Sequence, residues 1–191
     1  MLLSHWVSTE LTSNNLPTGF IWAGNGIFRS VTRQEFKAVV YHREVDTPGL
    51  PKFKQEFKLL VPPVLKAKVK AIIDRINQHP NLEQLFYLYW RDNAWEVICP
   101  EQECTPTNCI SLEQHPEPAA IEIHSHGSMG AFFSATDNRE ENGCRISTVI
   151  GRNNNQLEIV SRVCVHGLFL NVSSDHIYQN INSYCRHVIP F

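Results

Sequence analysis

The chain has 191 residues, of which 42% are hydrophobic and 19% are charged, as is typical of a globular protein with a sizeable core. Its formal net charge of −2 excludes an overall basic field that would recruit nucleic acid or anionic lipid. No apolar run approaches the roughly 20 residues that a membrane span needs. The N-terminal residues also lack the basic start and apolar stretch of a secretory signal, so we expect a cytoplasmic protein.

Residues 1–60 are predicted to form a β-rich N-terminal extension. Residues 19–31 have the pattern of two short strands around a Gly-Asn-Gly turn at residues 24–26. Residues 35–45 form a further candidate strand, and the following proline- and glycine-containing segment predicts a loop. The large side chains expected to pack in the core here are Trp22 and Phe28.

Residues 61–191 are predicted to form a second unit, or to continue the first as one domain. Residues 62–79 are the clearest helix, because two prolines suit a helix start and Pro80 prevents continuation. Apolar residues recur there at helical spacing and predict one buried stripe. The stripe consists of Leu65, Val69, Ile72, Ile73 and Ile76.

The rest of the chain is predicted to alternate strands with loops. A sheet of this kind, carrying at least one long helix, indicates a mixed α/β fold of the α+β class. The polar segment 101–118 is expected to be a loop, and residues 139–141 a solvated helical turn. Cys164 and His166 are expected to pack in a core strand. The expected strands are residues 82–90, 94–100, 119–126, 145–151 and 156–172.

The six cysteines are expected to remain reduced thiols, because no secretory signal precedes them. Cys99, Cys104 and Cys109 are evenly spaced and could suggest a metal site. They form no C-x-x-C pair and have no neighbouring histidine at ligand spacing. We therefore interpret them as loop residues.

The segment from residue 121 to residue 137 carries the clearest chemistry. His124 and His126 alternate at the end of a predicted strand, so both imidazoles should lie on one face. A loop of small residues follows, and Asp137 can then supply a carboxylate oxygen. Two nitrogens and one oxygen leave a fourth position open, which is typical of a catalytic zinc site. Alternatively, Ser134 and Asp137 have the spacing of a helix capping box, which need not exclude a metal.

This segment resembles the H-x-H-x(7)-S-x(2)-D signature of the JAMM metalloproteases, also called JAB/MPN domains. The matching residues are His124-Ser125-His126, Ser134 and Asp137, at the same spacing. The resemblance covers roughly residues 62–170 and is closest to bacterial members. It implies the MPN architecture, a curved mixed β-sheet packed by helices and related to the cytidine deaminases. It also implies one catalytic Zn²⁺ held by both histidines and Asp137, with Ser134 stabilising the oxyanion.

The family also uses a glutamate from an earlier strand to carry a proton from the attacking water to the leaving amine. Glu83 occupies that place in this chain, because it follows the predicted helix and precedes His124 by 41 residues. Glu122 is the alternative, since alternation puts it on the same face as the two histidines. We favour Glu83, although the segment after it lacks the family's common glycines. A second departure is Gly127, which stands where the family usually has proline.

The resemblance implies a metallopeptidase or isopeptidase that hydrolyses an amide or isopeptide bond. Its expected substrate is a ubiquitin-like protein or a peptide C-terminal tail, and E1-like or E2-like proteins encoded nearby are expected partners. The alternative is a non-catalytic MPN scaffold, although such scaffolds typically lack the ligands present here. A zinc deaminase is disfavoured, because that chemistry uses His-x-Glu and a later P-C-x-x-C, whereas here His126 stands in place of the glutamate and no C-x-x-C exists.

Overall fold

The N-terminal part of the chain forms a five-stranded sheet in the computed structural model, which describes residues 5–6, 18–114 and 117–188. The first fifteen residues, which we expected not to be a secretory signal, lie almost entirely outside these ranges. The sheet order is β1-β2-β3-β4-β5. The predicted hairpin turn is confirmed at residues 24–25, and the predicted strand at residues 35–45 is confirmed as β4. The strands are β1 (His5–Trp6), β2 (Thr18–Ala23), β3 (Gly26–Thr32), β4 (Phe36–Arg43) and β5 (Glu56–Leu59).

One of the two predicted core residues of this sheet is not in the core. Phe28 is buried, as expected, but Trp22 is 42% exposed. The Trp22 indole Nε1 donates a hydrogen bond to Thr47 Oγ1 at 2.8 Å, which fixes the ring on the outside of the sheet. An aromatic ring with a polar edge is often placed in this way at a surface.

Helix α1 (Lys66–Gln78) is the predicted long helix, but it begins four residues later than expected. The backbone before it is extended because Val64 forms an isolated parallel bridge with Tyr178. This pairing uses backbone groups that a helix start would need. Leu65 therefore lies outside the buried stripe and is exposed, whereas the four other predicted stripe residues are buried.

A seven-stranded sheet forms the centre of the molecule, in the order β13-β12-β11-β10-β6-β7, with β14 added beside β12. The β10–β11 and β12–β14 pairs are parallel and the others antiparallel, so the sheet is mixed, as predicted. The strands are β6 (Leu85–Arg91), β7 (Ala94–Ile98), β10 (Ile121–Ser125), β11 (Cys144–Asn153), β12 (Gln156–Val165), β13 (Leu168–Val172) and β14 (Arg186–His187).

Residues 156–172, predicted as one strand, form the hairpin β12–β13 instead. The chain reverses at His166 and Gly167, whose φ angles are +52° and +81°. His166 is therefore exposed at a turn and does not pack in the core, whereas Cys164 is buried as expected. The sequence signal for this turn is only one glycine within an apolar run, which is weak.

The segment predicted to be a loop at residues 101–118 contains the short hairpin β8 (Gln102–Cys104) and β9 (Cys109–Ser111). Cys104 and Cys109 are paired across it and joined by a disulfide. The expectation that all six cysteines stay reduced is therefore wrong for this pair. Cys99, Cys144, Cys164 and Cys185 are thiols in the structure.

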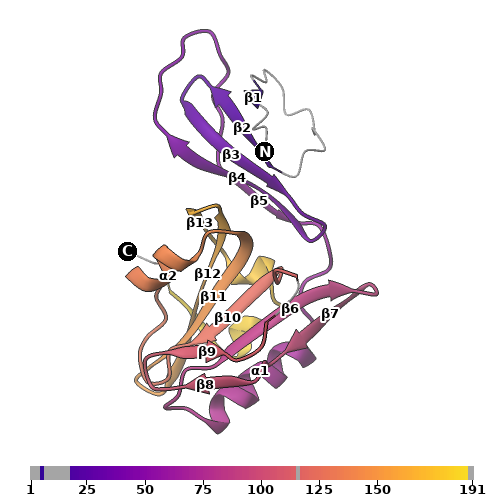
Figure 1. The fold of residues 1–191 in the computed structure, drawn as a ribbon, viewed down its shortest axis with the longest axis vertical. Helices are drawn as coiled ribbons and strands as arrows, with labels where there is room; N and C mark the ends of the chain where they lie inside the picture. The colour runs from indigo at the N-terminus through magenta and orange to yellow at the C-terminus, as the bar shows by residue number, and fades with distance from the viewer. Residues whose placement is uncertain (1–4, 7–17, 115–116, 189–191) are drawn as a thin grey trace.

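The core lies between the central sheet, α1 and the N-terminal sheet. Apolar side chains of β3 and β4 belong to the same buried cluster as those of α1, β10, β11 and β12. β4 packs on β12 and β13, and the N-terminal sheet sits above that end of the central sheet (Figure 1). Because the two sheets share this core, the division of the chain into two units near residue 60 stays a prediction. The remaining helices are α2 (Ala135–Glu140), η1 (Ser174–His176) and η2 (Ile181–Ser183).

The fold is of the mixed, sheet-rich α+β class, as predicted. A search of the helices in the described ranges finds none with the length and apolar character needed to cross a membrane.

Candidate metal centre

His124 and His126 lie at the end of β10, on the face of the sheet opposite α1. Ile121 and Ile123 alternate with them and join the core under α1. Because successive side chains of a strand point to opposite faces, both imidazoles lie on the face away from α1. The two ring centroids are 5.1 Å apart. The predicted common face of the two histidines is therefore confirmed.

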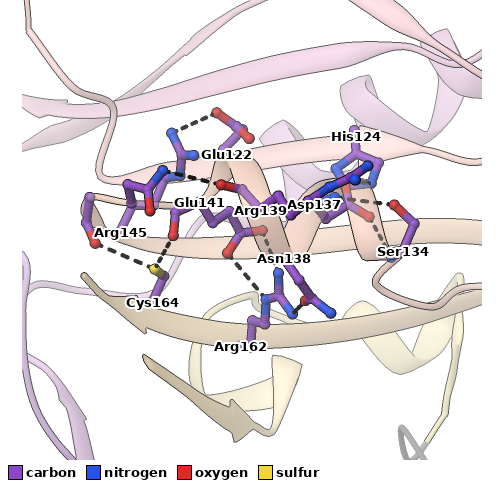
Figure 2. Close-up of polar contacts among 12 residues, drawn as sticks. Glu122, His124, Ser134, Asp137, Asn138, Arg139, Glu141, Arg145, Arg162 and Cys164 are labelled. Carbon is purple, nitrogen blue, oxygen red and sulfur yellow. Dashed lines mark hydrogen bonds and ion pairs between the residues drawn. The ribbon is translucent and has the colours of Figure 1, made fainter. Parts of the chain in front are cut away.

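Asp137 reaches the histidines from α2, which covers this face of the sheet. One candidate ligand atom from each of His124, His126 and Asp137 can be chosen so that all three atoms lie within 4.8 Å of one another. His124 Nε2 is 3.5 Å from Asp137 Oδ1. Figure 2 shows Asp137 and Ser134 beside His124 at one end of the helix.

The capping-box interpretation is also confirmed. The Ser134 backbone N–H donates to Asp137 Oδ2 at 2.6 Å, and the Asp137 N–H donates to Ser134 Oγ at 3.2 Å. Asp137 can cap the helix and bind a metal at the same time, because the cap uses Oδ2 while Oδ1 faces His124. The cap thus fixes the carboxylate in the orientation in which its second oxygen points at the imidazole.

The donor atoms fit a divalent transition metal. His124 Nε2 is buried and has no hydrogen-bond partner among the described residues, a costly state for a ring nitrogen without a ligand. His126 Nδ1 lies 3.1 Å from the Gly130 carbonyl oxygen, so donating to it would leave Nε2 with a free lone pair. Two imidazole nitrogens and one carboxylate oxygen are a donor set typical of catalytic zinc.

Burial keeps both imidazoles in the neutral form that binds metals. Desolvation lowers the pKa of His124 to about 4, against the opposing attraction of the Asp137 carboxylate. Burial also lowers the pKa of His126, although its contact with Gly130 acts in the opposite direction. At neutral pH neither ring therefore has to lose a proton before it binds a cation.

The register between β6 and β10, continued past the strand ends, puts Glu83 opposite His126. β6 and β10 pair antiparallel with His124 opposite Leu85, and the Ser125 N–H donates to the Gln84 carbonyl, so the pairing continues one residue past the strand. This register puts Glu83 on the histidine face, where it is 8% exposed. Burial, followed by repulsion from Asp137, raises the pKa of Glu83 to about 7. The structure therefore brings Glu83 to the three candidate ligands.

Glu122, the alternative to Glu83, also lies on the histidine face but has another partner. Its Oε2 is 3.1 Å from Arg145 Nη1 on the neighbouring strand β11. Burial raises the pKa of the Glu122 carboxyl, and the attraction of Arg145 opposes this rise. Glu122 is thus held in an ion pair two residues before His124 on β10, whereas Glu83 lies opposite a candidate ligand.

The loop between His126 and α2 is held close to the sheet. Gly127 has a φ of +49°, and a Cβ there would lie 3.2 Å from the backbone of Asn81. Proline, which the resemblance predicts at this position, cannot adopt that angle. Gly151 lies under the same loop, and a Cβ on it would come within 2.2 Å of the backbone at Gly130 and Ala131. Both glycines allow the loop to approach the site.

The aromatic residues of this loop differ in role. The Phe132 ring packs edge-on against His126 with centroids 4.6 Å apart, yet the residue is 45% exposed. Phe133 packs on a small buried cluster formed by Ala131, Val149 and Val160. Phe132 can therefore meet a bound molecule, whereas Phe133 packs against the protein itself.

A buried ion pair beside the candidate ligands was not predicted. Glu141, expected to be solvated, is 3% exposed and pairs with Arg162 of β12. The sequence did contain a signal, since Arg162 lies among mostly apolar residues in the second half of its strand, and a charge buried there requires a partner. The identity of that partner could not be read from the spacing.

The comparisons agree with this geometry. The model of a protein family described as prokaryotic homologs of the JAB domain matches residues 59–165. The match covers more than half of the chain and includes Glu83, both histidines, Ser134 and Asp137. A search of the curated proteins found no match. The chain therefore belongs to the family of prokaryotic JAB-domain homologs.

Proposed function

We propose that this chain is a zinc-dependent hydrolase of amide or isopeptide bonds, and that its sheet and helices form the MPN architecture. The observation that carries the proposal is the convergence of His124, His126 and Asp137, with a buried and unpartnered imidazole nitrogen facing a carboxylate oxygen. The JAB family includes non-catalytic members as well as metalloproteases. The complete ligand set favours the enzyme.

The two imidazoles and the Asp137 carboxylate would hold one Zn²⁺. A zinc ion in such a site supplies Lewis-acid chemistry, polarising a carbonyl and activating water at neutral pH. In two of the three ligands a second polar atom is already engaged, with His126 at the Gly130 carbonyl and Asp137 at the Ser134 N–H. Such outer contacts orient ligands and raise the metal affinity of a site.

Glu83 would transfer the proton and Ser134 would assist at the carbonyl. A carboxyl with a pKa near 7 can both accept a proton from water and return it to a leaving amine near neutral pH. The Ser134 oxygen accepts a hydrogen bond from the Asp137 N–H, so its own proton is available to a developing oxyanion. Neither role requires a covalent intermediate, so the cysteines are not needed for the reaction.

The substrate we propose is the C-terminal tail of a ubiquitin-like protein, acted on in the cytoplasm, with E1-like or E2-like proteins as partners. The resemblance of the His124–Asp137 segment to the JAMM signature suggests this substrate class, and the exposed Phe132 ring beside His126 offers an apolar contact for an extended tail. The net charge of −2 does not favour nucleic acid or anionic lipid as partners.

The test measures zinc content and cleavage of a ubiquitin-like fusion by the wild type, Glu83→Gln and Glu122→Gln. We expect Glu83→Gln to keep its zinc and to lose about 100- to 10,000-fold in kcat, as removal of a general base does. Glu122→Gln is the matched control from the same face and should stay within about threefold of the wild type. Full activity of Glu83→Gln would reject Glu83 as the proton carrier. Wild-type protein without zinc would favour the non-catalytic scaffold.

A further inference from the structure

Arg162 is a buried arginine in the middle of β12, beneath the helix that carries Asp137. The residue is 4% exposed. Its guanidinium lies between two aromatic rings, with Cζ 3.8 Å from the centroid of Phe133 and 3.8 Å from that of Phe169. A planar cation stacked on both sides has little freedom to move. The Arg162 side chain is therefore held in one conformation on the sheet.

Arg162 binds α2 and its C-cap residue Glu141 through three of its nitrogen atoms. Nε donates to Glu141 Oε2 at 3.1 Å, and Nη2 lies 2.9 Å from Glu141 Oε1, which makes a two-point contact with one carboxylate. Nη1 donates to Asn138 Oδ1 at 2.5 Å. Figure 2 shows this arginine reaching up from β12 to Asn138 and Glu141. Asn138 and Glu141 follow Asp137 along the chain, whereas the stacking partner Phe133 precedes it, so the contacts of Arg162 lie on both sides of Asp137.

Helix α2 has little else to hold it in place. It has six residues, too few to be stable by itself in water. None of these six residues, all of which the structure describes, is buried, so the helix has no apolar face of the usual kind against the sheet. The capping box at Ser134 stabilises only its first turn, whereas the polar contacts to Arg162 tie it to the sheet. Cys164 contributes at the far end, where its thiol contacts the Glu141 carbonyl oxygen at 3.3 Å.

The location of Asp137 depends on where this helix lies. Asp137 is one residue from Asn138 and four from Glu141, so a shift of the anchored residues moves its carboxylate with them. Ligand distances in metal sites are defined to within about 0.2 Å, and a displacement larger than that weakens binding. The histidines, by contrast, lie at the end of a strand within the sheet and do not need α2.

We propose that Arg162 is a positioning residue that holds Asp137 at the metal site by clamping α2 to the sheet. This inference rests on the proposed metal site, but not on the reaction catalysed there. Lysine cannot replace the arginine, because an ammonium lacks the planar fork that binds both Glu141 oxygens and stacks between two rings. The contacts that hold α2 thus require the guanidinium group, and a positive charge alone would not replace them.

The test compares metal affinity and folding stability in Arg162→Lys, Asn138→Ala and Tyr178→Phe. Zinc affinity is measured by competition with a chelator, and the absorption spectrum of the cobalt-substituted protein reports the ligand geometry. We expect Arg162→Lys to bind zinc about 10- to 100-fold more weakly, the range found for outer-shell changes, with an altered cobalt spectrum. Asn138→Ala removes one exposed contact of the clamp and should weaken zinc binding in the same direction while remaining folded.

Tyr178→Phe is the control for a general loss of stability. It removes a buried hydrogen bond of 2.7 Å to Thr148, in the core beside Val69 and Ile72 of α1 and away from α2. We expect a lower melting temperature with unchanged zinc affinity. Zinc affinity equal to the wild type in both Arg162→Lys and Asn138→Ala would overturn the proposal. If the wild type binds zinc but cleaves nothing, the proposed function fails while the clamp is still tested by affinity.

Discussion

Replacing Glu83 by glutamine should change how the stability of the metal-free protein depends on pH. The pKa of Glu83 is raised from its ordinary 4.5 to about 7 in the folded protein. The folded state then binds the proton more tightly than the unfolded state does. The contribution of this group to the free energy of unfolding is fully present below pH 4.5 and is lost as the pH rises to about 7.

The magnitude follows from the pKa difference. Each pKa unit corresponds to about 1.36 kcal/mol, so a rise from 4.5 to about 7 corresponds to on the order of 3 kcal/mol. We take this as an upper value, since water reaching a partly solvated carboxyl reduces the effect. Glutamine does not titrate, so Glu83→Gln should gain on the wild type by about 1 to 3 kcal/mol between pH 4.5 and pH 8.

The assay is urea unfolding of chelator-treated wild type and Glu83→Gln at these two pH values. Chelation is required because a bound cation beside Glu83 would lower the pKa of its carboxyl and remove the effect. The other titrating groups, including both histidines, are common to the two proteins and cancel to first order in the difference. An identical difference in unfolding free energy at both pH values would refute the argument that Glu83 is desolvated next to Asp137.

Three further predictions concern the same site. Asp137→Asn should keep the helix cap but lower zinc affinity by more than about 100-fold, measured by chelator competition, with the exposed Glu140→Gln as the unaffected control. Ser134→Ala should lower the unfolding free energy by about 1 kcal/mol through the lost cap and kcat by about 100- to 1,000-fold through the lost donor. A stability loss with unchanged kcat would leave Ser134 with the structural role alone. Gly127→Ala should cost about 1 to 2 kcal/mol in thermal unfolding because of its positive φ, and an unchanged melting temperature would contradict this.

The sequence by itself determined the local features whose physics is short-range. The strand period of two was enough to put His124 and His126 on one face, and helical spacing was enough to identify the buried side of α1. The capping box at Ser134 and Asp137 also follows from four neighbouring residues. These predictions hold because each depends on backbone geometry within one element.

Where the sequence analysis failed, a contact between different elements of the fold decided the outcome. The start of α1 moved because Val64 pairs with Tyr178, more than a hundred residues away. Trp22 lies outside the core because Thr47 offers its indole a hydrogen bond. Cys104 and Cys109 became partners because a hairpin folds in a segment with few strand signals. Spacing along the chain carries no information about such contacts.

Only the tertiary structure could bring Glu83 opposite His126, because strand register is set by side-chain packing across the whole sheet. The raised pKa of Glu83 arises from the same packing, since it needs both burial and the nearby charge of Asp137. The pairing of Arg162 with Glu141 likewise joins a strand to the end of a helix, across 21 residues of sequence. The residue types that can bind a metal were thus determined locally, whereas their convergence required the long-range contacts of the folded chain.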